Sequence, residues 1–343
     1  MEATFRIAII GCGWAGRRHA EACKTAGVLV RWAVDTNVGR ARAVQGLHPN
    51  ARVTANYRDA IADPDVNAVD ICLPHALHAA VTLDAARAGK HVLCEKPMAA
   101  TLEEADQMIA ATEHAQVTLM IAENVRFDPL LRKVADLLND GIIGRPALIQ
   151  VNREAYLNQS FLEERRWFLK NSLSAGGIMM SGGVHDIEKL RMLVGEVESI
   201  QAVRVRQRFT QMEGDDTSVA LVRFCDGTTG VMIESFMMMS LATAAGSEVH
   251  TLRIDGELGS LVVPNESTIR IYTERPGLWA DPGAVQHDLH VASADTFALE
   301  MEHFVNSIRR GEEPLTSGRW QRRPLQVVLA AYESMRTGQS VRV

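Results

Sequence analysis

The segment from Phe5 to Asp35 constrains the fold more than any other part of this chain. The run FRIAII is short, apolar and rich in branched side chains, which is typical of a strand buried in a parallel sheet. It leads into GCGWAG and a helical pattern from Ala15 to Ala26, and a second apolar run, Val28 to Val34, ends at Asp35. A strand, a glycine turn, a helix and an acidic residue about twenty residues on predict a unit that binds a dinucleotide.

The glycine turn and the acidic residue also predict which dinucleotide binds. GCGWAG satisfies GxGxxG, whose glycines allow a tight turn, a close approach of the pyrophosphate and packing of the helix on the strand. The first amides of the helix favour an anion. The Asp35 carboxylate accepts hydrogen bonds from the ribose hydroxyls of NAD and repels the additional phosphate of NADP, so we expect NAD. The predicted cofactor contacts here are Gly11, Gly13, Trp14, Ala15, Gly16 and Asp35.

Strand and helix patterns continue to alternate up to Glu123. Such alternation builds a doubly wound parallel sheet, so we expect a Rossmann domain over residues 1–123. The predicted helices are 39–47, 76–88 and 102–115, and the predicted strands lie around Val53 and at 69–73, 91–94 and 117–123.

The hydrophobic pattern of the sequence changes after Pro129. Longer alternating runs separated by turn signals such as DGTTG and GELG predict a large, mainly antiparallel open sheet in an α/β domain over residues 124–343. The predicted strands are 141–154 after its opening turn, 197–209, 217–224, 229–239, 249–256 and 260–264, and the predicted helices are one through Leu138 and those near 296–309 and 319–336. The stretch from Thr273 to Ala292 is expected to be a long exposed loop.

Composition excludes several classes of function. The 343 residues carry a formal charge of −6 and no run of Lys and Arg, which argues against nucleic acid as a partner. The five cysteines are scattered without the spacing of a zinc site, so we expect a reducing compartment and no metal. The N-terminus lacks the pattern of a signal peptide, and no apolar run is long enough to span a membrane. These features predict a cytoplasmic enzyme with no membrane contact.

Several segments together resemble one known family. CEKPMA at 94–99 looks like the EKP signature of the Gfo/Idh/MocA oxidoreductases, which are NAD(P)-dependent enzymes of sugars and cyclitols. CLPHALH at 72–78, NVRFDP at 124–129 and GIIGRP at 141–146 are similar to further segments of that family. GGIMMSGGVHDIEKLRMLVG at 176–195 is similar to its substrate helix. The resemblance follows the same order and spacing over nearly the whole chain.

The resemblance implies the architecture and the catalytic residues. It implies a Rossmann domain and an α/β domain with the active site between them, and an open sheet that often forms an oligomer interface. We therefore expect a homodimer or homotetramer through the C-terminal sheet. In the family, the lysine of EKP and the histidine of the substrate helix surround the reacting carbinol, and those positions here are Lys96 and His185.

Oxidation of a secondary alcohol requires a base for the hydroxyl proton and stabilisation of the developing alkoxide. Imidazole, with an ordinary pKa of ~6.5, exchanges a proton near neutrality, so we predict His185 as general base and acid. Lys96 is predicted to orient and polarise the oxygen, and an exchange of the two roles stays open. By the same resemblance, further cofactor contacts are predicted for Leu73, His75, His78, Glu95, Lys96, Pro97 and Asn124. His75 stands where the family has asparagine, and a helix-capping role is an equal alternative.

The main departure from the family lies in the substrate helix. Ser181 stands where the family commonly has an aspartate, four residues before His185, and i and i+4 positions share a face of an α-helix. This departure affects the expected substrate more than the chemistry, whereas Asp186 and Glu188 are expected to be structural. The predicted substrate contacts, suited to a polyhydroxylated small molecule, are Lys96, Arg126, Arg166, Trp167, Ser181 and His185.

Three functions follow from these observations, in order of preference. The first is an NAD-dependent dehydrogenase of a sugar, cyclitol or related hydroxylated ring. The second is a glycoside-processing enzyme that uses NAD transiently, in oxidation followed by elimination. The third is a non-catalytic NAD-binding regulator, which Lys96 and His185 make least favoured.

Overall fold

The computed structural model describes residues 5–157, 162–163, 165–237, 248–273, 275 and 286–343. The chain forms two compact units, Met1–Phe127 with Asp295–Leu325, and Asp128–Ala294 with Gln326–Val343. The predicted domains, 1–123 and 124–343, follow chain order, whereas in the structure a C-terminal segment groups with the N-terminal unit. Each unit is described below by itself.

The first unit contains a six-stranded parallel sheet with the strand order β3-β2-β1-β4-β5-β6. The order reverses between β1 and β4, which is the arrangement of a doubly wound fold. The predicted Rossmann sheet is therefore confirmed. The strands are β1 (Arg6–Ile10), β2 (Leu29–Val34), β3 (Arg52–Thr54), β4 (Ala68–Ile71), β5 (His91–Glu95) and β6 (Leu119–Ala122).

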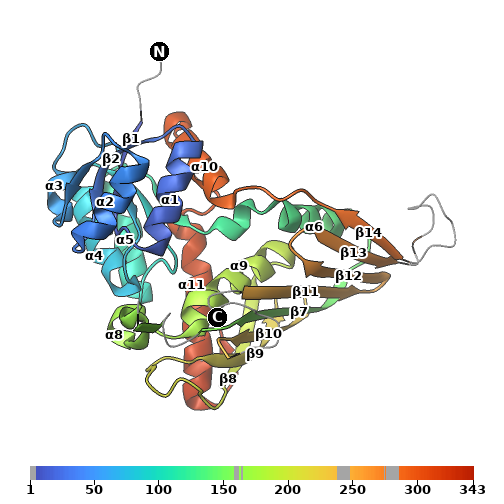
Figure 1. Ribbon diagram of the computed structural model, residues 1–343. Coiled ribbons are helices and arrows are strands. Elements are labelled where there is room, and N and C mark those ends of the chain that lie inside the picture. Colours follow the sequence, from blue (N-terminus) through green and yellow to red (C-terminus); the bar gives the residue numbers. More distant parts are fainter. Residues whose placement is uncertain (1–4, 158–161, 164, 238–247, 274, 276–285) are drawn as a thin grey trace. The chain divides into compact units, whose positions relative to one another are not determined.

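Helices from both ends of the chain belong to this unit. Helix α10, which precedes the last helix of the chain, lies beside α1 (Figure 1). Phe304 of α10 is fully buried and meets Phe5 edge-on, with ring centroids 6.4 Å apart. This shared core explains why a segment distant in sequence joins the N-terminal unit. The helices are α1 (Trp14–Thr25), α2 (Val38–Leu47), α3 (Tyr57–Ile61), α4 (His78–Arg87), α5 (Leu102–His114), α10 (Thr296–Arg310) and the start of α11 (Gly318–Thr337), with 3₁₀ helices η1 (His75–Leu77) and η2 (Asn124–Phe127).

The second unit contains a nine-stranded sheet with the order β14-β13-β12-β11-β7-β10-β9-β8-β15. All of its neighbouring strands are antiparallel except β7 and β10, so the predicted mainly antiparallel sheet is confirmed. The strands are β7 (Pro146–Ala155), β8 (Val197–Arg204), β9 (Thr217–Phe224), β10 (Thr229–Ser235), β11 (Glu248–Gly256), β12 (Gly259–Asn265), β13 (Thr268–Thr273), β14 (Gln286–His290) and β15 (Val341–Arg342).

Three predicted boundaries in this unit need correction. The expected loop from Thr273 to Ala292 contains strand β14, which pairs with β13; residues 274 and 276–285 of that stretch lie outside the described residues. The strand forms there because β13 offers a free edge and Arg270 pairs with Asp288 across it, Nε to Oδ1 2.8 Å. The predicted strand 197–209 ends at Arg204. The predicted strand 229–239 ends at Ser235, and residues 238 and 239 lie outside the described residues.

Helices of the second unit pack on its sheet, with α9 against β7 and α6 against β13. They are α6 (Pro129–Asn139), α8 (Asn171–Ser174), α9 (Val184–Leu193) and the end of α11, with a 3₁₀ helix η3 (Arg166–Leu169) and a π-helix η4 (Met179–Gly183). Within the described ranges, no helix has the length and apolar character needed to cross a membrane.

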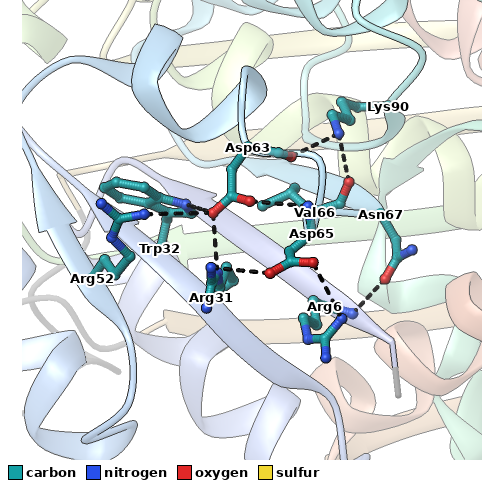
Figure 2. A network of polar contacts seen from close by, with 9 residues as sticks. All are labelled: Arg6, Arg31, Trp32, Arg52, Asp63, Asp65, Val66, Asn67 and Lys90. Carbon is teal, nitrogen blue, oxygen red and sulfur yellow. Dashed lines mark hydrogen bonds and ion pairs between the residues drawn. The ribbon is translucent and has the colours of Figure 1, made fainter. Parts of the chain in front are cut away.

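A network of charges holds the loop between α3 and β4 in the first unit (Figure 2). The Asp63 carboxylate accepts hydrogen bonds from Arg31 Nε at 3.0 Å, Trp32 Nε1 at 2.8 Å and the backbone N–H of Asp65 at 2.9 Å. Lys90 Nζ donates to the carbonyl oxygens of Asp63 and Val66 at 2.9 and 2.7 Å. Burial alone would raise the pKa of Asp63, but the hydrogen bonds that its carboxylate accepts from Asp65, Trp32 and Arg31 lower it to about 2.

This depressed pKa predicts a pH-dependent contribution to stability. Because the pKa of Asp63 is about 2 in the folded chain, against ~3.9 for a free side chain, its contribution is full above pH ~4 and is lost as the pH falls toward 2. Asp63→Asn should lower the free energy of unfolding at neutral pH by on the order of 1 kcal/mol, after screening by solvent. Urea unfolding at several pH values should show the two proteins converging near pH ~2–3. Asp65→Asn is the control, since that side chain is 54% exposed; a constant difference at all pH values would contradict the prediction.

Candidate active site

The first unit gathers the predicted cofactor residues at one edge of its sheet. The carboxyl ends of parallel strands meet at the same edge, and a ligand binds there where the strand order reverses. The glycine turn follows β1, next to β4 in the sheet, and Lys96 follows β5, the strand beyond β4. Of the predicted residues, Gly11, Asp35 and Lys96 directly follow strands at this edge, His75 and Asn124 begin the next helices, and Leu73 lies in the loop between β4 and η1.

The three positions of the turn are glycine for different physical reasons. Gly11 has a φ of +96°, and a Cβ there would overlap the carbonyl oxygen of Cys72. A Cβ on Gly16 would overlap the carbonyl oxygen of Gly11. A Cβ on Gly13, by contrast, would meet no protein atom within 4 Å. The fold therefore requires Gly11 and Gly16, whereas Gly13 leaves open space of the kind a pyrophosphate needs at a helix N-terminus.

The start of α1 is also suited to an anion. Its N-cap, Gly13, makes no side-chain capping hydrogen bond, and the first turn carries no acidic residue. Asp35 fixes the turn, because its carboxylate accepts hydrogen bonds from the backbone N–H groups of Cys12 at 2.9 Å and Asn37 at 2.7 Å. Each carboxylate oxygen keeps further acceptor capacity for a ribose hydroxyl. Trp14 is 61% exposed beside this turn, so the residues present fit a bound dinucleotide.

His78 ties together two loops of this edge. Its ring nitrogens lie 2.9 Å from the carbonyl oxygen of Pro97 and 2.8 Å from that of Leu73, and burial lowers its pKa. A neutral ring donates to one of the two and a charged ring to both. His78 thus holds the loops after β4 and β5, and its contact with a cofactor stays a prediction. His75 occupies neither capping position, because the N-caps of η1 and α4 are Pro74 and Leu77; its capping alternative is wrong.

Lys96 lies in a turn whose backbone is held by its neighbours. The Lys96–Pro97 peptide bond is cis, and the Lys96 N–H donates to Glu95 Oε2 at 3.0 Å.

Two further predicted residues lie in η2, after β6. Asn124 Nδ2 donates to Thr296 Oγ1 at 2.9 Å, which joins the end of β6 to the start of α10. Arg126 lies over the ring of Trp320, 5.0 Å from its centroid.

In the second unit, the predicted substrate helix begins with a wider turn than expected. Residues Met179–Gly183 form a π-helix that continues into α9, so the α-helical spacing assumed for Ser181 and His185 does not hold at its start. Ser181 Oγ donates to the carbonyl oxygen of Gly177 at 3.0 Å, and both Ser181 and His185 are half-buried. Single π turns occur frequently at functional sites.

The beginning of this helix is capped by two residues distant in sequence. Asp215 accepts hydrogen bonds from the backbone N–H groups of Gly177 and Met179 at 3.2 and 3.1 Å. Tyr332 Oη donates to Asp215 Oδ1 at 2.7 Å and accepts from the N–H groups of Gly177 and Met180 at 2.9 and 3.1 Å. Burial and the Asp215 charge raise the pKa of Tyr332. No sequence pattern indicated either residue, because both act across the tertiary structure.

Buried charges lie beneath the same helix. Asp186 pairs with Arg153 Nε and Lys189 Nζ, each at 2.7 Å, and these side chains are at most 9% exposed. Burial would raise the pKa of Asp186, but the two cations hold it well below its usual range; burial and the Asp186 charge raise the pKa of Glu234. A Cβ on Gly182 would lie 2.7 Å from Arg153 Cδ, so the glycine lets the helix rest on this network. Asp186 is structural, as predicted.

The remaining predicted substrate residues lie in the 3₁₀ helix η3. Arg166 is exposed. Trp167 is half-buried and packs edge-on against Phe168, with ring centroids 5.1 Å apart, at the border of a small apolar cluster. An indole in this position presents one part to the core and another part to solvent.

Comparison with known proteins places these features in a family. Residues 5–123 match the model described as oxidoreductase family, NAD-binding Rossmann fold, and residues 131–262 match the GFO/IDH/MocA C-terminal domain. An uncharacterized oxidoreductase, YrbE of Bacillus subtilis, is 30% identical over 232 residues, 66% of each chain. Myo-inositol 2-dehydrogenase of Thermotoga maritima is 28% identical over 346 residues, 98% of each chain. The solved structure of levoglucosan dehydrogenase with NADH and levoglucosan shares the fold, with a TM-score of 0.88, 23% identity and 99% of each chain covered.

The glycine geometry predicts a variant that separates cofactor binding from folding. In Gly13→Ala, the added methyl group meets no protein atom but occupies the space of the pyrophosphate, so affinity for NAD should fall at least ~10-fold with little change in thermal stability. Titration of NADH fluorescence and thermal unfolding measure the two effects. Gly46→Ala in α2 is the matched control, because a Cβ there also meets nothing within 4 Å. Equal NAD affinity in Gly13→Ala and wild type would contradict the assigned site.

The distant cap predicts a second variant. Tyr332→Phe removes one donor and one acceptor from buried partners and should destabilise the second unit by about 1–3 kcal/mol. Hydrogen exchange should become faster at the backbone amide of Met180, which loses this acceptor, and to a smaller extent at that of Gly177, which keeps Asp215 as an acceptor. Tyr272→Phe is the control, because that side chain is exposed on β13. Unchanged exchange at both amides would show that Tyr332 does not hold this helix.

Proposed function

Because the chain belongs to the Gfo/Idh/MocA family of NAD-binding oxidoreductases, we propose that it transfers a hydride between the nicotinamide of NAD and a secondary alcohol or ketone. The proposed substrate is a sugar, cyclitol or related hydroxylated ring. The names of the relatives, among them myo-inositol 2-dehydrogenase and D-apiose dehydrogenase, support this class.

One observation carries the proposal more than any other. Lys96 stands at the same sheet edge as the glycine turn, directly after β5, which β4 separates from β1. The sheet is a rigid element, so it holds the backbone at Lys96 and the N-terminal end of α1 in a constant relation. This shared edge supports the proposal that Lys96 acts on a substrate oxygen near the nicotinamide.

NAD supplies the hydride acceptor when it is bound, and the chain supplies the proton chemistry. His185 is proposed to take the hydroxyl proton during oxidation and to return it during reduction. Lys96 is proposed to donate a hydrogen bond to the reacting oxygen, which stabilises the alkoxide as it forms. Arg126, Arg166, Trp167 and Ser181 are the proposed contacts to the remaining hydroxyl groups and the ring. Ser181, a neutral hydroxyl, is proposed to shift the substrate preference from that of relatives with an aspartate there.

The second unit offers a surface for self-association. On the face of the sheet that its own helices leave open, Val203 and Leu221 are 53% and 52% exposed. Val231 pairs with Leu221 in the ladder and Ile233 with Val219, which extends the apolar surface over β10. We propose a homodimer or homotetramer through this face.

All five cysteines are free thiols, which supports the proposed cytoplasmic location.

The central prediction concerns Lys96. Lys96→Ala should lower kcat by at least ~100-fold, because a hydrogen-bond donor to the developing alkoxide is lost, and should leave NAD affinity within a few fold of wild type. Turnover is measured as NADH formation with a panel of free sugars, sugar acids, inositols and glycosides, with NAD and NADP side by side. Lys24→Ala is the control, since that lysine is exposed on α1. Unchanged turnover in Lys96→Ala would remove the lysine from the mechanism.

The same panel of compounds distinguishes the proposed dehydrogenase function from the alternative of a glycoside-processing enzyme that uses NAD transiently. A dehydrogenase forms NADH in proportion to the oxidised product. Release of an aglycone from a glycoside with catalytic NAD and without accumulation of NADH would overturn the proposed net oxidation.

A further inference from the structure

A buried histidine connects two carboxylates in the first unit. His19 lies on α1, one turn after Gly16, Asp70 on β4 and Glu95 at the end of β5. His19 Nδ1 lies 3.0 and 2.9 Å from the two carboxylate oxygens of Asp70, and Nε2 lies 3.2 Å from Glu95 Oε1. The side chains of His19, Asp70 and Glu95 are 1%, 0% and 12% exposed. Neither the GxGxxG pattern nor the EKP signature includes this histidine.

The geometry determines the protonation of the ring. An ionised carboxylate accepts hydrogen bonds and donates none, so each ring nitrogen of His19 must donate to its own partner. Burial by itself would lower the pKa of His19, but the Asp70 charge and the hydrogen bonds raise it well above its usual value. The contacts and the raised pKa together indicate a protonated His19 between the two carboxyl groups. Cys72 also lies near, within a group whose ligand atoms are all within 4.8 Å, but Nδ1 already donates to Asp70 and is not free to bind a metal.

The surrounding charges agree with this arrangement. Glu300 of α10 is 1% exposed, and its Oε2 has no hydrogen-bond partner among the described residues. Burial raises the pKa of Glu300 well above its usual value, so it adds no anion to the centre. Among the described residues, His19 is the basic side chain that contacts both Asp70 and Glu95.

The bridge reaches the backbone of the proposed catalytic lysine. Glu95 uses Oε1 toward His19, and its Oε2 accepts the N–H of Lys96 at 3.0 Å. Contacts therefore run without a gap from α1, the helix of the glycine turn, through His19 and Glu95 to the Lys96 turn. A shift of about 1 Å in a reacting group lowers a rate by up to ~100-fold, so a rigid link of this kind has a direct effect on turnover.

We propose that His19 is a positioning residue, which by bridging Asp70 and Glu95 holds the Lys96 turn in register with the glycine turn that binds the cofactor. The inference rests on the proposed function for its effect on turnover, but the bridge itself concerns the geometry of Lys96. Removing either end of the link should therefore displace the same lysine by the same route.

A double-mutant cycle tests the link. His19→Gln retains a single amide donor group, and Glu95→Gln removes the charge while keeping nearly the same shape. Each change should lower kcat by ~10–100-fold with KM for NAD within a few fold, and the double variant should lose little more than the worse single variant. His48→Gln is the matched control, because His48 Nε2 also contacts α1, at the carbonyl oxygen of Ala20 2.8 Å away, but does not touch Glu95. Losses in kcat that simply multiply in the double variant would overturn the proposal.

A second measurement needs no substrate. The amine of Lys96 is labelled with pyridoxal phosphate and borohydride, and the labelled peptide is quantified by mass spectrometry against that of the exposed Lys24. The ratio should change several-fold in His19→Gln and Glu95→Gln and stay constant in His48→Gln. An unchanged ratio in both variants would overturn the positioning role. If His19→Gln does not fold, Glu95→Gln, at a half-buried side chain, gives the labelling result alone.

These two measurements separate the possible failures. If no compound of the panel yields NADH or product with the wild-type protein, the proposed function is wrong, and the labelling ratio still decides the role of His19. If the wild type turns over a substrate and the variants match it in kcat and labelling, the proposed function stands and the positioning role is wrong.

Discussion

Each predicted catalytic residue is next in sequence to an ion-paired carboxylate that is at most 12% exposed, and the local structure depends on those pairs. Glu95 precedes Lys96 and pairs with His19, and Asp186 follows His185 and pairs with Arg153 and Lys189. A buried charge that loses its partner destabilises a protein by about 3–5 kcal/mol, so such a pair strongly disfavours any other arrangement of its loop or helix. In each case the neighbour in sequence thus holds the backbone that carries the predicted reactive side chain.

The two units achieve this rigidity in different ways. In the first, only glycine fits at position 11, against the carbonyl oxygen of Cys72 directly after β4, and at position 16, against the carbonyl oxygen of Gly11. His19 lies one turn further along the helix that begins there. In the second, the π turn that carries Ser181 rests on Arg153 through Gly182 and is capped by Asp215 and Tyr332. Ser181 Oγ donates to the carbonyl oxygen of Gly177 within the same stretch of helix.

Much of the fold was accessible from local patterns. Period-two and period-3.6 runs, with glycines at turns, predicted the parallel sheet of the first unit, the antiparallel sheet of the second and the two C-terminal helices. The patterns failed where a partner distant in sequence decides the outcome. Strand β14 exists because β13 offers it an edge, and α10 joins the first unit because Phe304 packs on Phe5, and neither fact is visible in the segment itself.

The sequence by itself determined the dinucleotide turn, the acidic residue after the second strand and the family motifs, because these depend on residues close together in the chain. Tertiary structure alone decided how those motifs are held. His19, Asp70 and Glu95 come from three separate elements, and Asp215 and Tyr332 cap a helix more than thirty residues from either of them. Buried hydrogen bonds and ion pairs form between atoms that folding brings together, and their partners are set by distance in space and not by spacing along the chain. The sequence thus predicted the glycine turn most clearly. The folded chain adds that Gly11 and Gly16 are required by close backbone contacts, whereas the space next to Gly13 is open to a ligand.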